Sequence, residues 1–174
     1  MVKIIVAPGT WSLRLRIGAA ALGLSAGLTV GLYFLRVANV HVVFWGFFSA
    51  IWALGALLLH VFYKQGRLRP HATRLRTAVY AGLIGQLIGF SAFVVYIVLG
   101  IVFHDDLKNL RASYFVASVW AFMTWKWAFV IFWYSRQYRM LMLEEALIPV
   151  GGEETLYVDA DQGSIISAPD VVIT

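Results

Sequence analysis

Four uninterrupted apolar stretches constrain this chain more than any other feature. They cover approximately residues 17–35, 42–63, 77–103 and 112–134. A helix of about 20 apolar residues, rising about 1.5 Å per residue, crosses the roughly 30 Å of bilayer hydrocarbon. Because 61% of the 174 residues are hydrophobic and only 13% are charged, a water-soluble fold is not expected. The first stretch exceeds the apolar core of a signal peptide, so it is interpreted as a retained helix. The pattern predicts an all-α membrane protein with four transmembrane helices.

Lysine and arginine residues are distributed unequally between the two sides of these spans. Ten precede the first span, separate the second from the third or follow the fourth, whereas three lie on the other side. Because cytosolic loops carry the excess of lysine and arginine, we predict that both termini are cytosolic. The net charge of +5 then faces membrane lipids, and no nucleic-acid partner is expected.

The sequence divides into a transmembrane domain, residues 1–140, and a C-terminal tail, residues 141–174. Seven of the nine acidic residues follow Met140, in a segment with little helical periodicity that we expect to be a mobile cytosolic tail. Residues 161–166 resemble an acidic dileucine-type sorting signal, which trafficking adaptors would bind.

Small residues recur at four-residue spacing in the first and third spans. Gly23, Gly27 and Gly31 form one such row, and Gly85 and Gly89 belong to another. Such rows let two helices approach closely in lipid. They favour either packing within one bundle or a homo-oligomer, and both readings stay open.

A few polar side chains lie within the spans or at their ends, where each is a candidate functional residue. Lys126 is about ten residues from the cytosolic end of the fourth span, and His60 lies near the cytosolic end of the second. His104 and His41 lie on the other side. The chain has no cysteine, so thiolate ligation of a metal is excluded.

Aromatic residues crowd the fourth span, and Trp120, Trp127 and Tyr134 share one helix face because they recur every seven residues. Aromatic rings beside a cation suit a flat apolar molecule that carries carboxylates. A metalloporphyrin fits this inventory: imidazole or phenolate would bind the iron transiently, and Lys126, Arg136 and Arg139 would hold the propionates.

Several short motifs are similar to those of the heme-responsive-gene family of heme transporters, solute carrier family 48. They are His60-Val-Phe-Tyr63, Ser113-Tyr114, Ser118-Val-Trp120, Lys126-Trp-Ala-Phe129 and Tyr134-Ser-Arg-Gln-Tyr138. The resemblance implies four helices with cytosolic termini. It also implies transport of heme into the cytosol from endosomes or lysosomes, or across the plasma membrane.

The resemblance also assigns roles to individual residues. It places the helix-two histidine at His60, the luminal-loop histidine at His104 and the tail motif at Tyr134 to Tyr138. Ser135 and Gln137 depart from the usual small residue and lysine of that motif, which weakens one propionate contact. Because relatives ligate with either histidine or tyrosine, Tyr63 and Tyr80 are reserve candidates.

The sequence therefore predicts a heme transporter in which heme is substrate and not resident cofactor. Heme would be captured near His104, pass along the aromatic face, meet His60 and leave by Arg136 and Tyr138. Two alternatives stay open: a membrane cytochrome subunit that retains heme, and a tetraspan-type trafficking scaffold. An enzyme is not expected, since no nucleophile–base pair or carboxylate dyad occurs in the spans.

Overall fold

The computed structural model describes residues 9–68, 72–105 and 109–147, and these residues form four helices without any strand. The helices are α1 (Thr10–Val37), α2 (Val40–Lys64), α3 (Ala72–Val102) and α4 (Tyr114–Leu147). Each contains a stretch that is long and apolar enough to cross a membrane. The four predicted spans are confirmed, and the chain is an integral, multi-pass membrane protein.

The chain divides into two units. Residues 1–142 hold the four helices as one bundle, and residues 143–174 form a second unit, of which the structure describes only the helical residues 143–147. The proposed sorting signal at residues 161–166 lies outside the described residues. The helices extend beyond the apolar stretches, because α1 starts at Thr10 and α4 continues to Leu147.

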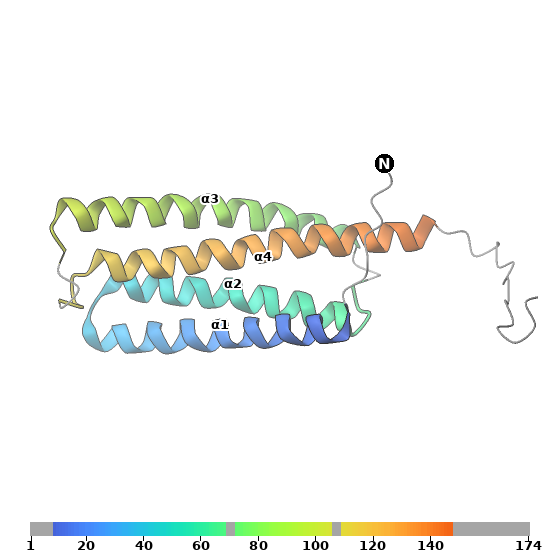
Figure 1. Cartoon of the computed structure of the whole chain (residues 1–174), viewed down its shortest axis with the longest axis horizontal. Helices are drawn as coiled ribbons and strands as arrows, with labels where there is room; N and C mark the ends of the chain where they lie inside the picture. The colour runs from blue at the N-terminus through green and yellow to red at the C-terminus, as the bar shows by residue number, and fades with distance from the viewer. Residues whose placement is uncertain (1–8, 69–71, 106–108, 148–174) are drawn as a thin grey trace, which may run out of the picture. The chain divides into compact units, whose positions relative to one another are not determined.

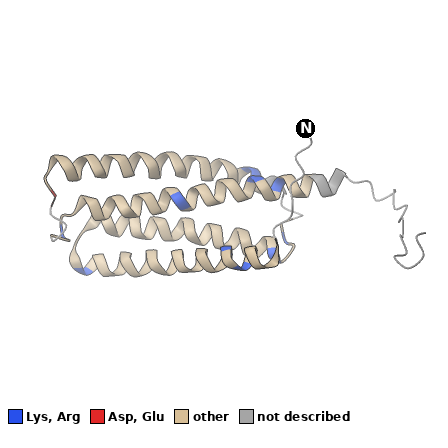
Figure 2. Cartoon of the chain, viewed as in Figure 1, with Lys and Arg blue, Asp and Glu red and all other residues tan. Residues whose placement is uncertain are grey.

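Helices that follow one another in the chain run antiparallel, so α1 begins at the same end of the bundle at which α2 ends and α3 begins (Figure 1). Basic side chains gather at this end, as Figure 2 shows, and we call it the basic end. From their positions along the helices, its described members are Arg14, Arg16, Lys64, Arg67, Arg76, Arg136 and Arg139. The opposite end carries Arg36, Asp105 and Arg111 among the described charged residues. That the basic end faces the cytosol stays a prediction.

Glycines allow the helices to pack closely within one chain. A Cβ atom added to Gly27 would lie 2.8 Å from the carbonyl oxygen of Gly46 on α2, and one added to Gly23 would collide with the Trp127 ring on α4. On α3, a Cβ atom at Gly89 would lie 2.7 Å from the backbone nitrogen of Trp125. These rows therefore serve contacts inside the bundle. Close packing stabilises the association of the helices there, because lipid supplies no hydrophobic driving force.

A single asparagine joins the two turns at the opposite end. Asn39 caps α2, because its Oδ1 atom accepts a hydrogen bond of 3.2 Å from the backbone nitrogen of Val42. Its Nδ2 atom donates to the carbonyl oxygens of Leu110, at 2.9 Å, and Ser113, at 3.3 Å. The turn between α1 and α2 is thereby bonded to the segment that leads into α4.

The C-terminus of α3 and the N-terminus of α4 are fixed by the same few residues. His104 has a left-handed backbone with φ of 51°, and Asp105 N donates to Gly100 O at 2.9 Å, as in a Schellman motif. The Asp105 carboxylate accepts hydrogen bonds from Ser113 Oγ, at 2.9 Å, and from Phe115 N, at 3.0 Å. The Asp105 carboxylate therefore caps α4.

Candidate functional site

The basic end contains a buried group of one histidine and three tyrosines, which we call the His60 cluster. It consists of His60 and Tyr63 on α2 and Tyr134 and Tyr138 on α4. His60 is only 1% exposed and Tyr138 is fully buried. His60 Nδ1 lies 2.9 Å from the Tyr138 hydroxyl oxygen, so the two side chains share a hydrogen bond between helices. Such a polar pair inside an apolar bundle is costly unless each group has a partner.

The other rings hold this pair in place. Tyr63 stacks on Tyr138 with centroids 3.9 Å apart and planes inclined by 7°. Tyr134 meets the His60 ring edge to face at a centroid distance of 4.9 Å. The guanidinium of Arg16 on α1 lies 4.4 Å from the Tyr134 ring centroid, a cation–π contact. Three helices thus contribute imidazole, phenol and guanidinium groups, which can bind iron and carboxylates.

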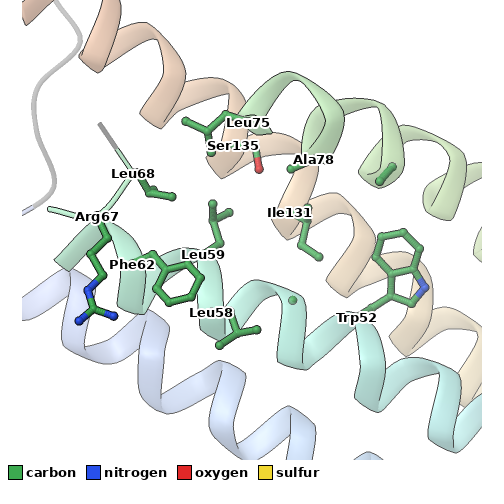
Figure 3. A pocket seen from close by; sticks show the side chains of 12 residues that line it. Trp52, Leu58, Leu59, Phe62, Arg67, Leu68, Leu75, Ala78, Ile131 and Ser135 are labelled. Carbon is green, nitrogen blue, oxygen red and sulfur yellow. The ribbon is translucent and has the colours of Figure 1, made fainter. Parts of the chain in front are cut away.

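A groove of about 580 Å³ runs along α2, α3 and α4 beside this cluster (Figure 3). Its volume falls within the usual range for small-molecule sites. Its walls are mainly apolar, and Arg67 and Trp52 lie at the two ends of the residues in Figure 3. Ser135 lines the groove, and its buried hydroxyl has no hydrogen-bond partner among the residues that the structure describes.

The groove and the His60 cluster share a wall. Leu59, Leu68 and Leu75 line the groove and also pack in the same core cluster as Tyr138. The histidine itself lies on another face of α2 from the groove-lining residues Leu58 and Phe62, since it is two residues from each. A molecule in the groove would therefore contact leucines that pack with Tyr138, and not the face of α2 that carries His60.

The structure places the remaining predicted residues of α4 away from the cluster. Arg136 is exposed and lies two residues from both Tyr134 and Tyr138, so it faces the other side of the helix. Arg139 is also exposed. Lys126 is exposed, with its Nζ atom 4.4 Å from the centroid of the buried Trp127 ring. The three cations are thus not brought together with His60.

The tryptophans of the aromatic face and the reserve tyrosine Tyr80 also lie apart from the His60 cluster. Trp120 is half-buried among residues near the opposite end, and Trp127 belongs to the central core. Tyr80 is exposed, and its hydroxyl accepts a hydrogen bond of 3.4 Å from Arg76 on the same helix. Of the reserve tyrosines, only Tyr63 joins the His60 cluster.

Histidines at the opposite end lie in a different setting. His104 is exposed in the turn after α3. His41 is exposed in the first turn of α2, and its Nδ1 atom lies 3.0 Å from the hydroxyl oxygen of Tyr96 on α3. The His41 ring also contacts Tyr114 on α4, at a centroid distance of 5.6 Å.

Sequence reasoning missed Arg16, Tyr96 and the buried hydroxyl of Ser135 as candidate site residues. Their roles depend on which residues of neighbouring helices face one another, and no residue pattern in one helix reports this. Tyr96 carried a weak signal, because it is a tyrosine within an otherwise apolar span.

Comparisons with known proteins agree on one family. The family described as haem-transporter, endosomal/lysosomal, haem-responsive gene matches residues 75–127, which include His104 and Lys126. The heme transporter hrg-1 of Caenorhabditis elegans is 34% identical over 137 residues, covering 75% of this chain and 71% of that protein. No solved structure matches.

Proposed function

The chain belongs to the heme-responsive-gene family of heme transporters, and from this premise we propose that it carries heme across the membrane that its helices span. The observation that best supports a route through the bundle is the buried bond between His60 and Tyr138. Polar groups inside a membrane protein are rare and commonly mark substrate pathways. Imidazole and phenolate are also two of the common protein ligands of heme iron.

We propose that His60 binds the iron transiently, and that Tyr138 first holds the imidazole and then replaces it as the single, oxygen ligand. Tyr63 and Tyr134 would bound the porphyrin face. The groove beside the cluster would hold the porphyrin body before or after this contact, with the Arg67 guanidinium near a propionate.

The exposed cations on α4 would contact the heme carboxylates outside the His60 cluster. Arg136 and Arg139 would attract the heme carboxylates at the surface of the basic end, where the substrate leaves. Lys126 would meet a propionate at mid-depth on the outside of the bundle, where its ammonium group already lies over the Trp127 ring. The charge count predicts that the basic end is cytosolic, and we propose that heme moves toward it from the opposite end.

The spacing of the histidines favours transport over retention of heme. His41 and His60 lie on the same helix, nineteen positions or about 28 Å apart along its axis, so they cannot ligate one iron together. His104 lies at the same end as His41. A heme at the basic end therefore meets only one histidine among the described residues, and weak single-ligand contacts suit a molecule that must be released.

Reconstitution of the full-length protein into liposomes tests this function. We expect that hemin or a fluorescent zinc porphyrin crosses these vesicles faster than it crosses protein-free vesicles. Equal rates would overturn the proposal. A stoichiometric Soret band that does not exchange with added apo-myoglobin would indicate the cytochrome subunit instead. Normal cellular heme uptake with a variant lacking residues 148–174 would argue against the scaffold.

A further inference from the structure

Three aromatic rings from three helices meet at the opposite end and form a second group, the His41 cluster. It consists of His41 on α2, Tyr96 on α3 and Tyr114 on α4. The His41 and Tyr96 rings meet edge to face at 5.5 Å, and the two tyrosine rings lie 6.3 Å apart with planes inclined by 25°. Phe103, which is 63% exposed, continues the aromatic surface at 5.8 Å from Tyr114.

The hydrogen bond within this cluster leaves one side of the imidazole available. His41 Nδ1 bonds to the Tyr96 hydroxyl at 3.0 Å, whereas the residue as a whole is exposed. Where Nδ1 carries the hydrogen and donates it to the phenol, the Nε2 lone pair is left bare. A histidine that binds a metal commonly has its second nitrogen held in this way, which fixes the ring and raises its basicity as a ligand.

His104, the histidine expected to capture heme, lacks such support. Its imidazole makes no hydrogen bond to any other residue that the structure describes, and its backbone conformation serves the end of α3. The neighbouring Asp105 carboxylate already caps α4 and is not directed toward an incoming metal. His41 is therefore the better-oriented ligand at this end.

We propose that the His41 cluster is the site that receives heme at the opposite end of the bundle. Nε2 of His41 binds the iron, Tyr96 positions the imidazole, and the rings of Tyr114 and Phe103 contact the porphyrin face. The exposed guanidinium of Arg111, in the segment before α4, would bind a propionate. This inference rests on the proposed heme transport and names its first binding site.

Hemin titration of the purified full-length protein tests the site. Measurements in a His60→Ala, Tyr138→Phe background remove both proposed iron ligands of the basic end, so that the remaining Soret change reports the opposite end. We expect that adding His41→Ala abolishes this change, whereas adding His104→Ala leaves it. The reverse pattern, or binding that survives His41→Ala, would overturn the proposal.

Tyr96→Phe tests the positioning role. It keeps the ring and removes the hydroxyl, so the Soret maximum of the complex should be unchanged while hemin affinity falls about 10–100-fold, as for other partners of metal-binding histidines. Tyr33→Phe is the matched control, because Tyr33 is an exposed tyrosine of α1 with no such bond. Equal affinity of the two tyrosine variants would contradict this role for Tyr96.

The liposome assay separates this inference from the transport function. If vesicles with the unmodified protein do not accelerate hemin crossing, the transport function fails, yet the titrations still report whether His41 binds iron. If those vesicles transport hemin and His41→Ala vesicles transport it equally well at low hemin concentration, transport stands and the receiving site is wrong.

Discussion

The two histidine–tyrosine pairs of α2 use the same hydrogen bond in opposite environments. His41 and Tyr96 join through Nδ1 and a hydroxyl at 3.0 Å, and His60 and Tyr138 join in the same way at 2.9 Å. The first histidine is exposed, whereas the second is 1% exposed behind closely packed rings. The same donor and acceptor types therefore offer an open site at one end and a closed one at the other.

The two ends therefore differ in how easily a porphyrin can reach the imidazole, and not in the type of ligand. A porphyrin can reach the exposed imidazole without rearrangement of the bundle. To reach His60 it must displace Tyr134 or Tyr138, or move the leucine layer between the groove and the phenol. Binding at the closed pair is thus coupled to a conformational change, whose free-energy cost weakens the binding and favours release.

The largest expected effect is from His60→Ala, which should remove most heme-dependent growth of a heme-auxotrophic host while protein levels persist. The variant removes the proposed iron ligand and the hydrogen bond that His60 makes with the buried Tyr138 hydroxyl. The loss of that bond should cost about 1–3 kcal/mol of stability. His60→Gln is the control, since its amide can still bond to the phenol but supplies no imidazole. Growth restored by His60→Gln would mean that the histidine acts through its hydrogen bond and packing and not as an iron ligand.

Paired Tyr→Phe variants should separate the two sites by stability. Tyr138→Phe leaves the buried Nδ1 atom of His60 without its hydrogen bond, so we expect a lower unfolding free energy by about 1–3 kcal/mol. Tyr96→Phe loses a bond that solvent can replace and should change stability less. Thermal unfolding in detergent measures both. Equal losses would contradict the distinction between an open and a closed pair.

Lys126→Met should lower heme uptake more than it lowers the amount of protein. The charge lies within the membrane span, so its removal should favour insertion by about 2.5 kcal/mol and offset the lost contact with Trp127 of about 0.5–1 kcal/mol. Uptake normalised to membrane protein measures the effect. A parallel decrease of both quantities would indicate that the lysine only stabilises the bundle.

The smallest effect is expected from Arg16→Gln, which removes the cation over Tyr134 at the closed site. Stability should fall by about 0.5–1 kcal/mol, the usual value of such a contact. Uptake of a porphyrin with free carboxylates should fall a few-fold. A porphyrin dimethyl ester lacks those charges and should be unaffected. If both porphyrins are slowed equally, Arg16 does not contact a carboxylate.

The sequence alone was sufficient to predict the four spans, because each apolar stretch is long enough to specify a helix by itself. It did not predict which faces meet. Tyr138 and Arg136 are neighbours in one motif, yet one is buried against His60 and the other is exposed on the far side of α4. Two positions along a helix correspond to about 200° of rotation, so a motif groups residues that the fold separates.

Partners from other helices were the least predictable part of the site. Arg16 meets Tyr134 only because α1 and α4 are adjacent at this depth, and Tyr96 meets His41 because α3 lies beside the start of α2. Side-chain packing and glycine contacts determine which residues of neighbouring helices meet. These contacts cannot be predicted from the hydropathy of a single segment.

The hydrogen bonds of Asn39 fix the bundle at one end only. Its amide fastens the two turns beside His41 through bonds to Leu110 and Ser113. The basic end carries the lysine and arginine residues of Figure 2 and a groove between its helices. Helices that are bonded together at one end separate more easily at the other. We therefore expect the bundle to open at the basic end, where heme would be released.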